Sequence, residues 1–229
     1  MRHSLACARN ARPFSKTNTA IADDLAHFNL DQQIKLAIDT LRFEYSKQYK
    51  REKVNQLGQW IKLTKGHSLC SKLAKRLTKK ELTSVYRLEN ENIYFYNYSN
   101  PPKYRDAMLV IFGISQPDKE PNHDLIRKVT SFLPITSLDI CLDTPSEPNL
   151  DALSKHFALT RYKDTNTYYI NQTGYPSLDK ITIYNKQSKN RLSYPLWRIE
   201  ATITIPTANP ELLSLPLSEF KHIIDLACN

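Results

Sequence analysis

The segment from Asp179 to Ile205 constrains the fold of this chain more than any other part of its sequence. It contains two runs in which apolar and polar residues alternate, KITIYNK and LWRIEATITI. Such alternation predicts β-strands, because successive side chains of a strand point to opposite faces of a sheet. The polar stretch QSKNRLSYP between the runs is long enough for an open hairpin loop. The segment therefore predicts two antiparallel strands with one apolar face and one polar face.

The polar face of this predicted hairpin is rich in reactive side chains. It carries Tyr184, Lys186, Arg198 and Glu200. One interpretation is a half-buried sheet with a solvated side, on which the tyrosine serves β-propensity and Arg198 forms an ordinary ion pair with Glu200. The other interpretation is a site that acts on phosphate, and both are open at this point.

A third alternating run, SLDICLD, places Asp139 and Asp143 on the face opposite its leucines and isoleucine. These carboxylates are four residues apart, which corresponds to about 13 Å along a strand. One of them is therefore expected to be a ligand and the other a neighbour. If this strand joins the hairpin with its polar side facing the same way, one aspartate meets Glu200 and Tyr184. Such oxygen ligands suit a hard divalent cation, and a tyrosine hydroxyl beside a metal and cationic side chains can attack phosphate.

The ordered set LDICLD, TYYI, ITIYNK and WRIE resembles the replication initiators of rolling-circle plasmids and filamentous phages. More specifically, it is similar to the Rep_trans or phage replication-initiation family, which includes relaxases of some integrative elements. The matching motifs are Leu138–Asp143, Tyr184–Lys186 and Trp197–Glu200, and Ser137 stands about where the family often has an arginine. The resemblance covers roughly Tyr86 to Ile205, about half of the chain.

The resemblance implies a protein that nicks and rejoins DNA through a tyrosine. Tyr184 would attack the scissile phosphate, release a 3′-hydroxyl and form a 5′-phosphotyrosine link. The link keeps the phosphodiester energy for later rejoining, so no ATP is needed. Tyr168, Tyr169 and Tyr175 are close enough in sequence to be rival nucleophiles.

The resemblance also implies roles for the charged residues of the three strands. Lys186 and Arg198 would neutralise phosphate oxygens, a task that suits the fork-shaped guanidinium group. Mg²⁺ or Mn²⁺ would be bound by Glu200 and by one of Asp139 and Asp143, and would polarise the phosphate.

The charge and composition of the chain narrow its partners and cofactors. Its 32 basic and 23 acidic residues give a net charge of +9, which favours a polyanion such as DNA, as origin duplex and as single strand. A basic protein without a nucleic-acid role is the alternative. The chain has 4 glycines and neither a GxGxxG nor a GxxxxGK[ST] motif, so no nucleotide cofactor is expected. No apolar run reaches the length of a signal peptide core or a membrane span, which predicts a cytoplasmic protein without a membrane partner.

The sequence predicts three regions. Residues 1–22 are expected to be a flexible basic arm. Residues 23–84 are expected to be helical, because Asn29 or Asp31 can cap a helix whose apolar residues recur at helical spacing from Ile34 to Tyr45. Residues 85–229 are expected to form the α+β initiator-like domain.

The most basic stretch, residues 62–82, contains a helix-breaking Gly66 and lies within the predicted helical region. Its charges suggest either the second helix of a DNA-reading helix-turn-helix or a helical hairpin with a solvated basic face. The candidate DNA-binding residues are Lys72, Lys75, Arg76, Lys79 and Lys80.

The predicted fold class is α+β, a mostly antiparallel sheet with helices packed on one face, preceded by a helical N-terminal region. Two other functions remain open, a non-catalytic DNA-binding protein on an initiator-like scaffold and a structural or RNA-binding domain. The sequence also leaves open whether the chain forms a homodimer.

Overall fold

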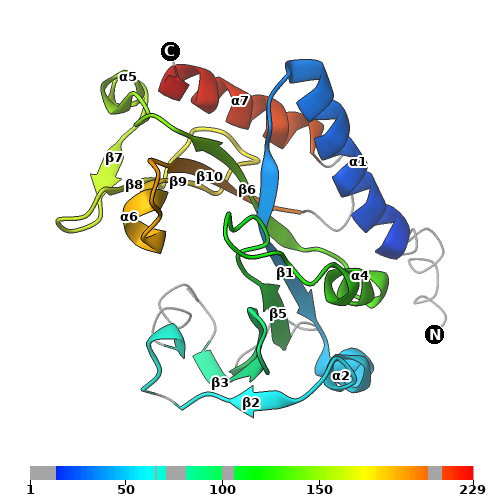
Figure 1. The fold of residues 1–229 in the computed structure, drawn as a ribbon. Coiled ribbons are helices and arrows are strands. Elements are labelled where there is room, and N and C mark those ends of the chain that lie inside the picture. Colours follow the sequence, from blue (N-terminus) through cyan, green and yellow to red (C-terminus); the bar gives the residue numbers. More distant parts are fainter. Residues whose placement is uncertain (1–13, 65, 71–80, 100–105, 206–212, 229) are drawn as a thin grey trace, which may run out of the picture.

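The computed structural model describes residues 14–64, 66–70, 81–99, 106–205 and 213–228 (Figure 1). In this part of the chain, a 10-stranded sheet has the order β2-β3-β4-β5-β1-β6-β10-β9-β8-β7. Every pair of neighbouring strands is antiparallel. The predicted α+β class with a mostly antiparallel sheet is therefore confirmed.

The strands are β1 (Ala37–Tyr45), β2 (Trp60–Lys62), β3 (Glu81–Leu88), β4 (Ile93–Ser99), β5 (Ala107–Ile111), β6 (Ser137–Thr144), β7 (Leu159–Arg161), β8 (Thr167–Ile170), β9 (Lys180–Asn185) and β10 (Trp197–Thr204). The helices are α1 (Phe14–Gln32), α2 (Lys47–Asn55), α4 (His123–Phe132), α5 (Leu150–Ser154), α6 (Lys186–Asn190) and α7 (Ser214–Cys228). None of these helices combines the length and the apolar character that a membrane span needs.

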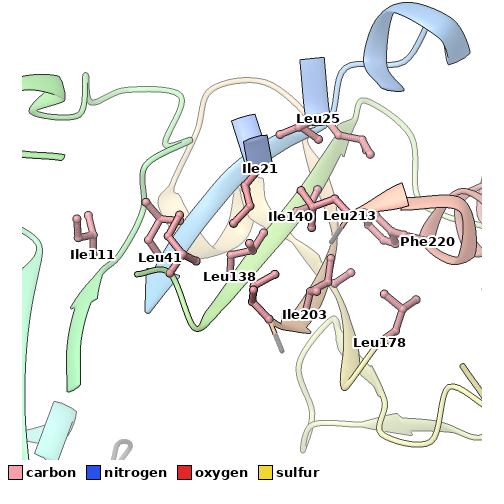
Figure 2. Close-up of a cluster of buried hydrophobic side chains, with 14 of the residues drawn as sticks. Ile21, Leu25, Leu41, Ile111, Leu138, Ile140, Leu178, Ile203, Leu213 and Phe220 are labelled. Carbon is pink, nitrogen blue, oxygen red and sulfur yellow. The ribbon is translucent and has the colours of Figure 1, made fainter. Parts of the chain in front are cut away.

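The main hydrophobic core lies between one face of the sheet and helices α1, α4 and α7. Figure 2 shows Ile21 and Leu25 of α1 beside Leu138 and Ile140 of β6, with Phe220 of α7 in the same cluster. These side chains are buried, and their removal from water is the main stabilising contribution to the fold. The opposite face of β1, β6, β10 and β9 carries the polar residues and is called the polar face below.

A buried asparagine fixes α1 against the end of α4. The Asn18 side-chain amide donates hydrogen bonds to the backbone oxygens of Thr130 and Leu133 at 2.8 and 2.9 Å. Its side-chain oxygen accepts a hydrogen bond from the amide of Ile135 at 3.1 Å.

Because α1 begins at Phe14, residues 14–22 of the predicted flexible arm are helical. Residues 1–13 lie outside the described part of the chain.

The helix predicted from Ile34 to Tyr45 is wrong, because Ala37–Tyr45 form β1 at the centre of the sheet. β1 pairs with β6 through an irregularity in which Ile38 opposes Ile140 and Thr40 opposes Asp139. The extra residue of such a bulge shifts the alternation of inward and outward side chains by one position. The resulting three-residue step from Ile38 to Leu41 imitates helical spacing, and this explains the wrong prediction.

The region predicted to be helical up to residue 84 also contains β2 and the start of β3, which extend the same sheet. It therefore does not form a purely helical unit. The candidate helix-turn-helix residues lie outside the described part of the chain, and these are Lys72, Lys75, Arg76, Lys79 and Lys80.

Candidate active site on the polar face of the sheet

The reactive residues of three strands meet on the polar face, because β6, β10 and β9 are direct neighbours. The register places Arg198 of β10 opposite Asp143 of β6 and opposite Tyr184 of β9. Glu200 lies one row further along, between Cys141 and Thr182. The structure thus brings together residues that are up to 61 positions apart in sequence, from Asp139 to Glu200.

Tyr184 lies against a carboxylate on this face. Its hydroxyl donates a hydrogen bond to Glu200 Oε2 at 3.3 Å, and its ring lies 4.0 Å from Lys189 Nζ. The side chain is only 6% exposed. Burial, followed by the charge of Glu200, raises the pKa of the Tyr184 phenol above its ordinary value. The phenol is therefore protonated at neutral pH, and its use as a nucleophile would require a base.

Glu200 is the group best suited to be that base. No ion pair joins it to any residue that the structure describes. Burial, together with the negative charges of Asp139 and Asp39, raises the pKa of Glu200 to about 7. A carboxylate with this pKa can accept a proton from the adjacent phenol near physiological pH.

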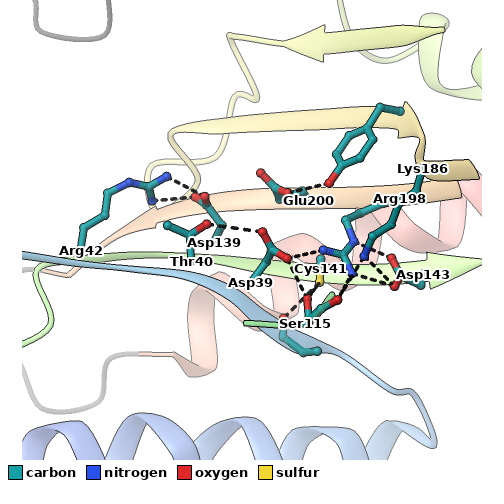
Figure 3. Close-up of polar contacts among 12 residues, drawn as sticks. Asp39, Thr40, Arg42, Ser115, Asp139, Cys141, Asp143, Lys186, Arg198 and Glu200 are labelled. Atoms are coloured by element: carbon teal, nitrogen blue, oxygen red, sulfur yellow. Dashed lines mark hydrogen bonds and ion pairs between the residues drawn. The ribbon is translucent and has the colours of Figure 1, made fainter. Parts of the chain in front are cut away.

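Arg198 is the most deeply enclosed charged residue of the site, with 1% of its surface exposed. Its guanidinium binds Asp143 in a bidentate manner, with Nε to Oδ1 at 2.5 Å and Nη2 to Oδ2 at 2.7 Å (Figure 3). It also forms an ion pair with Asp39 and donates to the backbone oxygen of Ser115 at 2.8 Å. Burial works against the charge, but the hydrogen bonds to Asp143 prevail, and the pKa of Arg198 is raised. In this arrangement Arg198 connects protein groups and does not present its fork to an external phosphate.

Lys186 is also turned inward, since its side chain is buried next to Arg198. Its ammonium group donates to the backbone oxygen of Ser115 at 3.1 Å and to Asp143 Oδ2 at 3.3 Å. Burial, followed by repulsion from Arg198, lowers the pKa of Lys186. Lys186 and Arg198 thus share Asp143 under the turn that contains Ser115.

Asp139 has a separate cationic partner. Its two carboxylate oxygens accept hydrogen bonds from Arg42 at 2.8 and 2.6 Å, and Oδ1 also accepts one from Thr202 at 2.8 Å. Burial would raise the pKa of Asp139, but the Arg42 guanidinium outweighs burial and holds it below its ordinary value. The two predicted aspartates therefore belong to different ion pairs on the same face.

Asp39 is a site residue that the sequence did not reveal. It occupies the β-bulge of β1, between the two paired residues Ile38 and Thr40. Its carboxylate accepts a hydrogen bond from Ser115 Oγ at 2.9 Å and forms the ion pair with Arg198. The signal in the sequence was a carboxylate between Ile38 and Thr40, and the interrupted alternation concealed that it lies on a strand.

The predicted metal ligands, Glu200 and one of Asp139 and Asp143, lie on this face. Among the described residues, no group of three or more His, Cys, Asp or Glu side chains is placed to hold a metal ion. A divalent cation shared by Glu200 and an aspartate would compete with Arg42 for Asp139, or with Arg198 for Asp143. As arranged, the predicted carboxylates do not form a ready metal site.

The rival tyrosines have different surroundings. Tyr168 and Tyr175 pack against the main core, away from the polar face. Tyr169 is opposite Thr182 in the register and lies on the polar face, with Lys180 Nζ 5.1 Å from its ring centroid. Tyr169 is therefore the rival that shares a face with Glu200.

The chain matches no protein-family model. No characterised protein matches it significantly either.

Proposed function

We propose that this protein nicks and rejoins DNA in rolling-circle replication initiation, with Tyr184 as the nucleophile. The observation that carries the proposal is the 3.3 Å contact between the Tyr184 hydroxyl and Glu200, on a sheet face that also holds several cations. Support also comes from the resemblance of the three strand motifs to rolling-circle initiators. The proposed reaction belongs in the cytoplasm, where such DNA is replicated.

In the proposed reaction, Glu200 accepts the phenol proton while the Tyr184 oxygen attacks phosphorus. The bond from phosphorus to the 3′-oxygen breaks, this oxygen takes up a proton, and the 5′-phosphate stays on the tyrosine. General base catalysis of this kind contributes about 100- to 10,000-fold to a rate. Reversal of the same steps by a free 3′-hydroxyl rejoins the strand.

The buried cations support this reaction through their electrostatic field. Burial raises the pKa of Tyr184 most, and the charge of Arg198 acts in the opposite direction, which favours the phenolate. Asp143, which also accepts a hydrogen bond from Lys186, binds Arg198 in the same cross-strand row as Tyr184. The resemblance implies that Lys186 and Arg198 contact the phosphate directly. For this contact, each side chain would have to release its carboxylate partner and bind the phosphate instead.

A divalent ion, Mg²⁺ or Mn²⁺, remains part of the proposal because the resemblance implies it. Glu200 is the carboxylate of this site that forms no ion pair with a described residue, and Asp139 or Asp143 would join it only after releasing an arginine. Such an ion, when bound, would neutralise charge on the phosphate.

The test is the capture of a covalent protein–DNA adduct from a random single-stranded DNA library, with Mg²⁺, Mn²⁺ or EDTA, on a denaturing gel. We expect an adduct that Tyr184→Phe abolishes and that Glu200→Gln slows by about 100- to 10,000-fold. Tyr169→Phe is the matched control and should leave the adduct intact. An adduct that persists in Tyr184→Phe and disappears in Tyr169→Phe would contradict the nucleophile assignment.

A non-catalytic DNA-binding protein is the second candidate function. It is favoured by the burial of Tyr184 and by the engagement of Arg198 and Lys186 with Asp39 and Asp143. For this function, DNA binding without any adduct is expected under all metal conditions of the same experiment.

A further inference from the structure

Three pairs of a tyrosine and a lysine follow one another across the polar side of the sheet, from β7 to β9. Lys163 Nζ lies 5.6 Å from the ring centroid of Tyr162, Lys180 Nζ 5.1 Å from that of Tyr169, and Lys189 Nζ 4.0 Å from that of Tyr184. We call these residues the tyrosine–lysine row, and its members are Tyr162, Lys163, Tyr169, Lys180, Tyr184 and Lys189.

The strand register places the tyrosines of this row on one face. The amide of Tyr162 donates a hydrogen bond to the oxygen of Thr167 at 2.8 Å, and Thr167 is opposite Tyr184. Tyr169 is opposite Thr182, which is opposite Glu200. The rings of Tyr162 and Tyr169 meet edge to face, with centroids 6.2 Å apart. Since neighbouring strands lie about 5 Å apart, the row extends about 10 Å from the β7 edge to the proposed nucleophile.

Exposure decreases along the row toward Tyr184. Tyr162 is 48% exposed, Tyr169 is partly exposed, and Tyr184 is buried. Lys163 and Lys189 are exposed on either side of Tyr169. The row thus offers accessible aromatic surface and positive charge at the sheet edge, and it leads to the buried hydroxyl.

Exposed aromatic rings next to lysines favour unpaired bases together with their phosphates. Aromatic rings accept unpaired bases by stacking, while adjacent lysines attract the phosphates between these bases. A duplex keeps its bases stacked on one another and cannot use the rings in this way. Asp164 follows Lys163 in the turn, but the three lysines outnumber it, and Asp179 is occupied by a hydrogen bond from Thr204. A solvated edge chosen only for β-propensity would not require a lysine over each ring.

We propose that the tyrosine–lysine row binds a single DNA strand that enters from the β7 edge and leads its scissile phosphate to Tyr184. Bases stack on Tyr162 and Tyr169, and the backbone passes Lys163, Lys180 and Lys189. That the DNA strand reaches Tyr184 for cleavage rests on the proposed function, whereas its binding to the tyrosine–lysine row does not.

The test measures binding of a fluorescein-labelled dT oligonucleotide by anisotropy, in a Tyr184→Phe background that prevents covalent capture. We expect Tyr162→Ala and Tyr169→Ala each to weaken binding by about 10-fold, because each removes one stacking platform. Tyr162→Phe and Tyr169→Phe keep the rings and should bind nearly as well as the parent. Lys180→Gln should also weaken binding, because it removes a cation from the proposed path of the phosphates. Lys155→Gln, which replaces an exposed lysine at the end of α5, is its charge-matched control and should not. Thermal unfolding of each variant verifies that it is folded.

Binding that changes less than twofold in both alanine variants would overturn the proposal, as would equal affinity for a duplex of the same length. Tighter binding of an rU oligonucleotide would replace DNA by RNA as the partner and would also overturn it. The proposed function and this inference are contradicted by different results. If the alanine variants keep their dT affinity and the Tyr184 adduct still forms, only this inference is removed. If dT affinity depends on the tyrosine–lysine row but no adduct forms, only the proposed nicking reaction is removed.

Discussion

At the scale of single residues, Glu200 differs from the three aspartates of the candidate site. Asp39, Asp139 and Asp143 each lie against an arginine, whereas no described residue forms an ion pair with Glu200. Burial and the neighbouring negative charges raise the pKa of Glu200 to about 7. Its protonation state therefore changes near physiological pH, and this change should be measurable in the stability of the fold.

The stability of the protein should depend on pH through Glu200. The folded chain binds the proton of Glu200 more tightly than the unfolded chain does. The stabilisation that this proton provides is therefore complete below about pH 4.5 and is lost as the pH rises through about 7. In EDTA, Glu200→Gln should therefore equal the wild type near pH 4 and exceed it near pH 8, by on the order of 1–3 kcal/mol in the free energy of unfolding. Urea titrations at several pH values measure this difference.

Glu147→Gln removes the same charge from the exposed turn after β6 and is the control for the Glu200 experiment. It should leave the pH dependence of the wild type unchanged. A Glu200→Gln protein whose stability runs parallel to the wild type at every pH would contradict the raised pKa.

At the scale of secondary-structure elements, Arg198 joins parts of the chain that the sequence separates. From β10 it reaches Asp143 on β6, Asp39 in the bulge of β1 and the backbone of Ser115 in the turn after β5. The bulge is essential to this arrangement, because it adds a residue to β1 at the point where Asp39 meets the guanidinium. The polar face is thus held together by one enclosed cation and its acceptors.

Loss of this cation should destabilise the fold strongly. Arg198→Ala leaves Asp39 and Asp143 without their shared partner in a largely enclosed site, and a cost of about 3–5 kcal/mol is typical for breaking such a pair. Arg198→Lys should recover only part of this loss, since an ammonium group cannot reproduce the bidentate geometry. Urea unfolding of the three proteins measures the changes.

The matched control for Arg198 is Arg127→Ala. Arg127 also pairs with an aspartate, Asp124, but its side chain is 77% exposed. Exposed pairs contribute little, so no measurable change is expected. Similar losses in Arg127→Ala and Arg198→Ala would show that the enclosed network has no special role.

At the scale of the whole molecule, the net charge of +9 is the property that bears on a DNA partner. Each phosphate neutralised by a lysine or arginine releases counterions, so the logarithm of the binding constant falls with the logarithm of the salt concentration. The candidate duplex-binding residues carry part of this charge. Their contribution can be measured without reference to their structure.

Neutralising the basic segment should weaken duplex binding and flatten its salt dependence. A quadruple glutamine variant should lower the magnitude of the salt slope by at most about four, since each phosphate contact contributes roughly 0.9. Binding to a duplex oligonucleotide between 50 and 200 mM salt, about the range in which such effects are large, gives the slope. The substituted residues are Lys75, Arg76, Lys79 and Lys80.

A second quadruple variant controls for net charge. It replaces four basic residues on the helices of the sheet's core side, and these are Arg127, Lys128, Lys155 and Lys221. Equal flattening in both variants would mean that the overall charge, and not the basic segment, determines duplex binding.

The sequence by itself determined the strands β6, β9 and β10 and the two faces of each. The alternation in SLDICLD, KITIYNK and LWRIEATITI is a local property, because it depends only on the geometry of a single extended chain. This is why the antiparallel sheet, and the presence of Tyr184, Arg198 and Glu200 on one face, could be predicted. The same rule failed at β1, where the bulge at Asp39 broke the alternation.

Only the tertiary structure decided which charges pair. Asp143 selects Arg198, Asp139 selects Arg42, and Glu200 is left with Tyr184. These choices follow from strand order and register, which join residues up to 159 positions apart. An ion pair depends on the distance between two charges in space. A sequence pattern predicts this distance only for residues that are close together along one strand or helix.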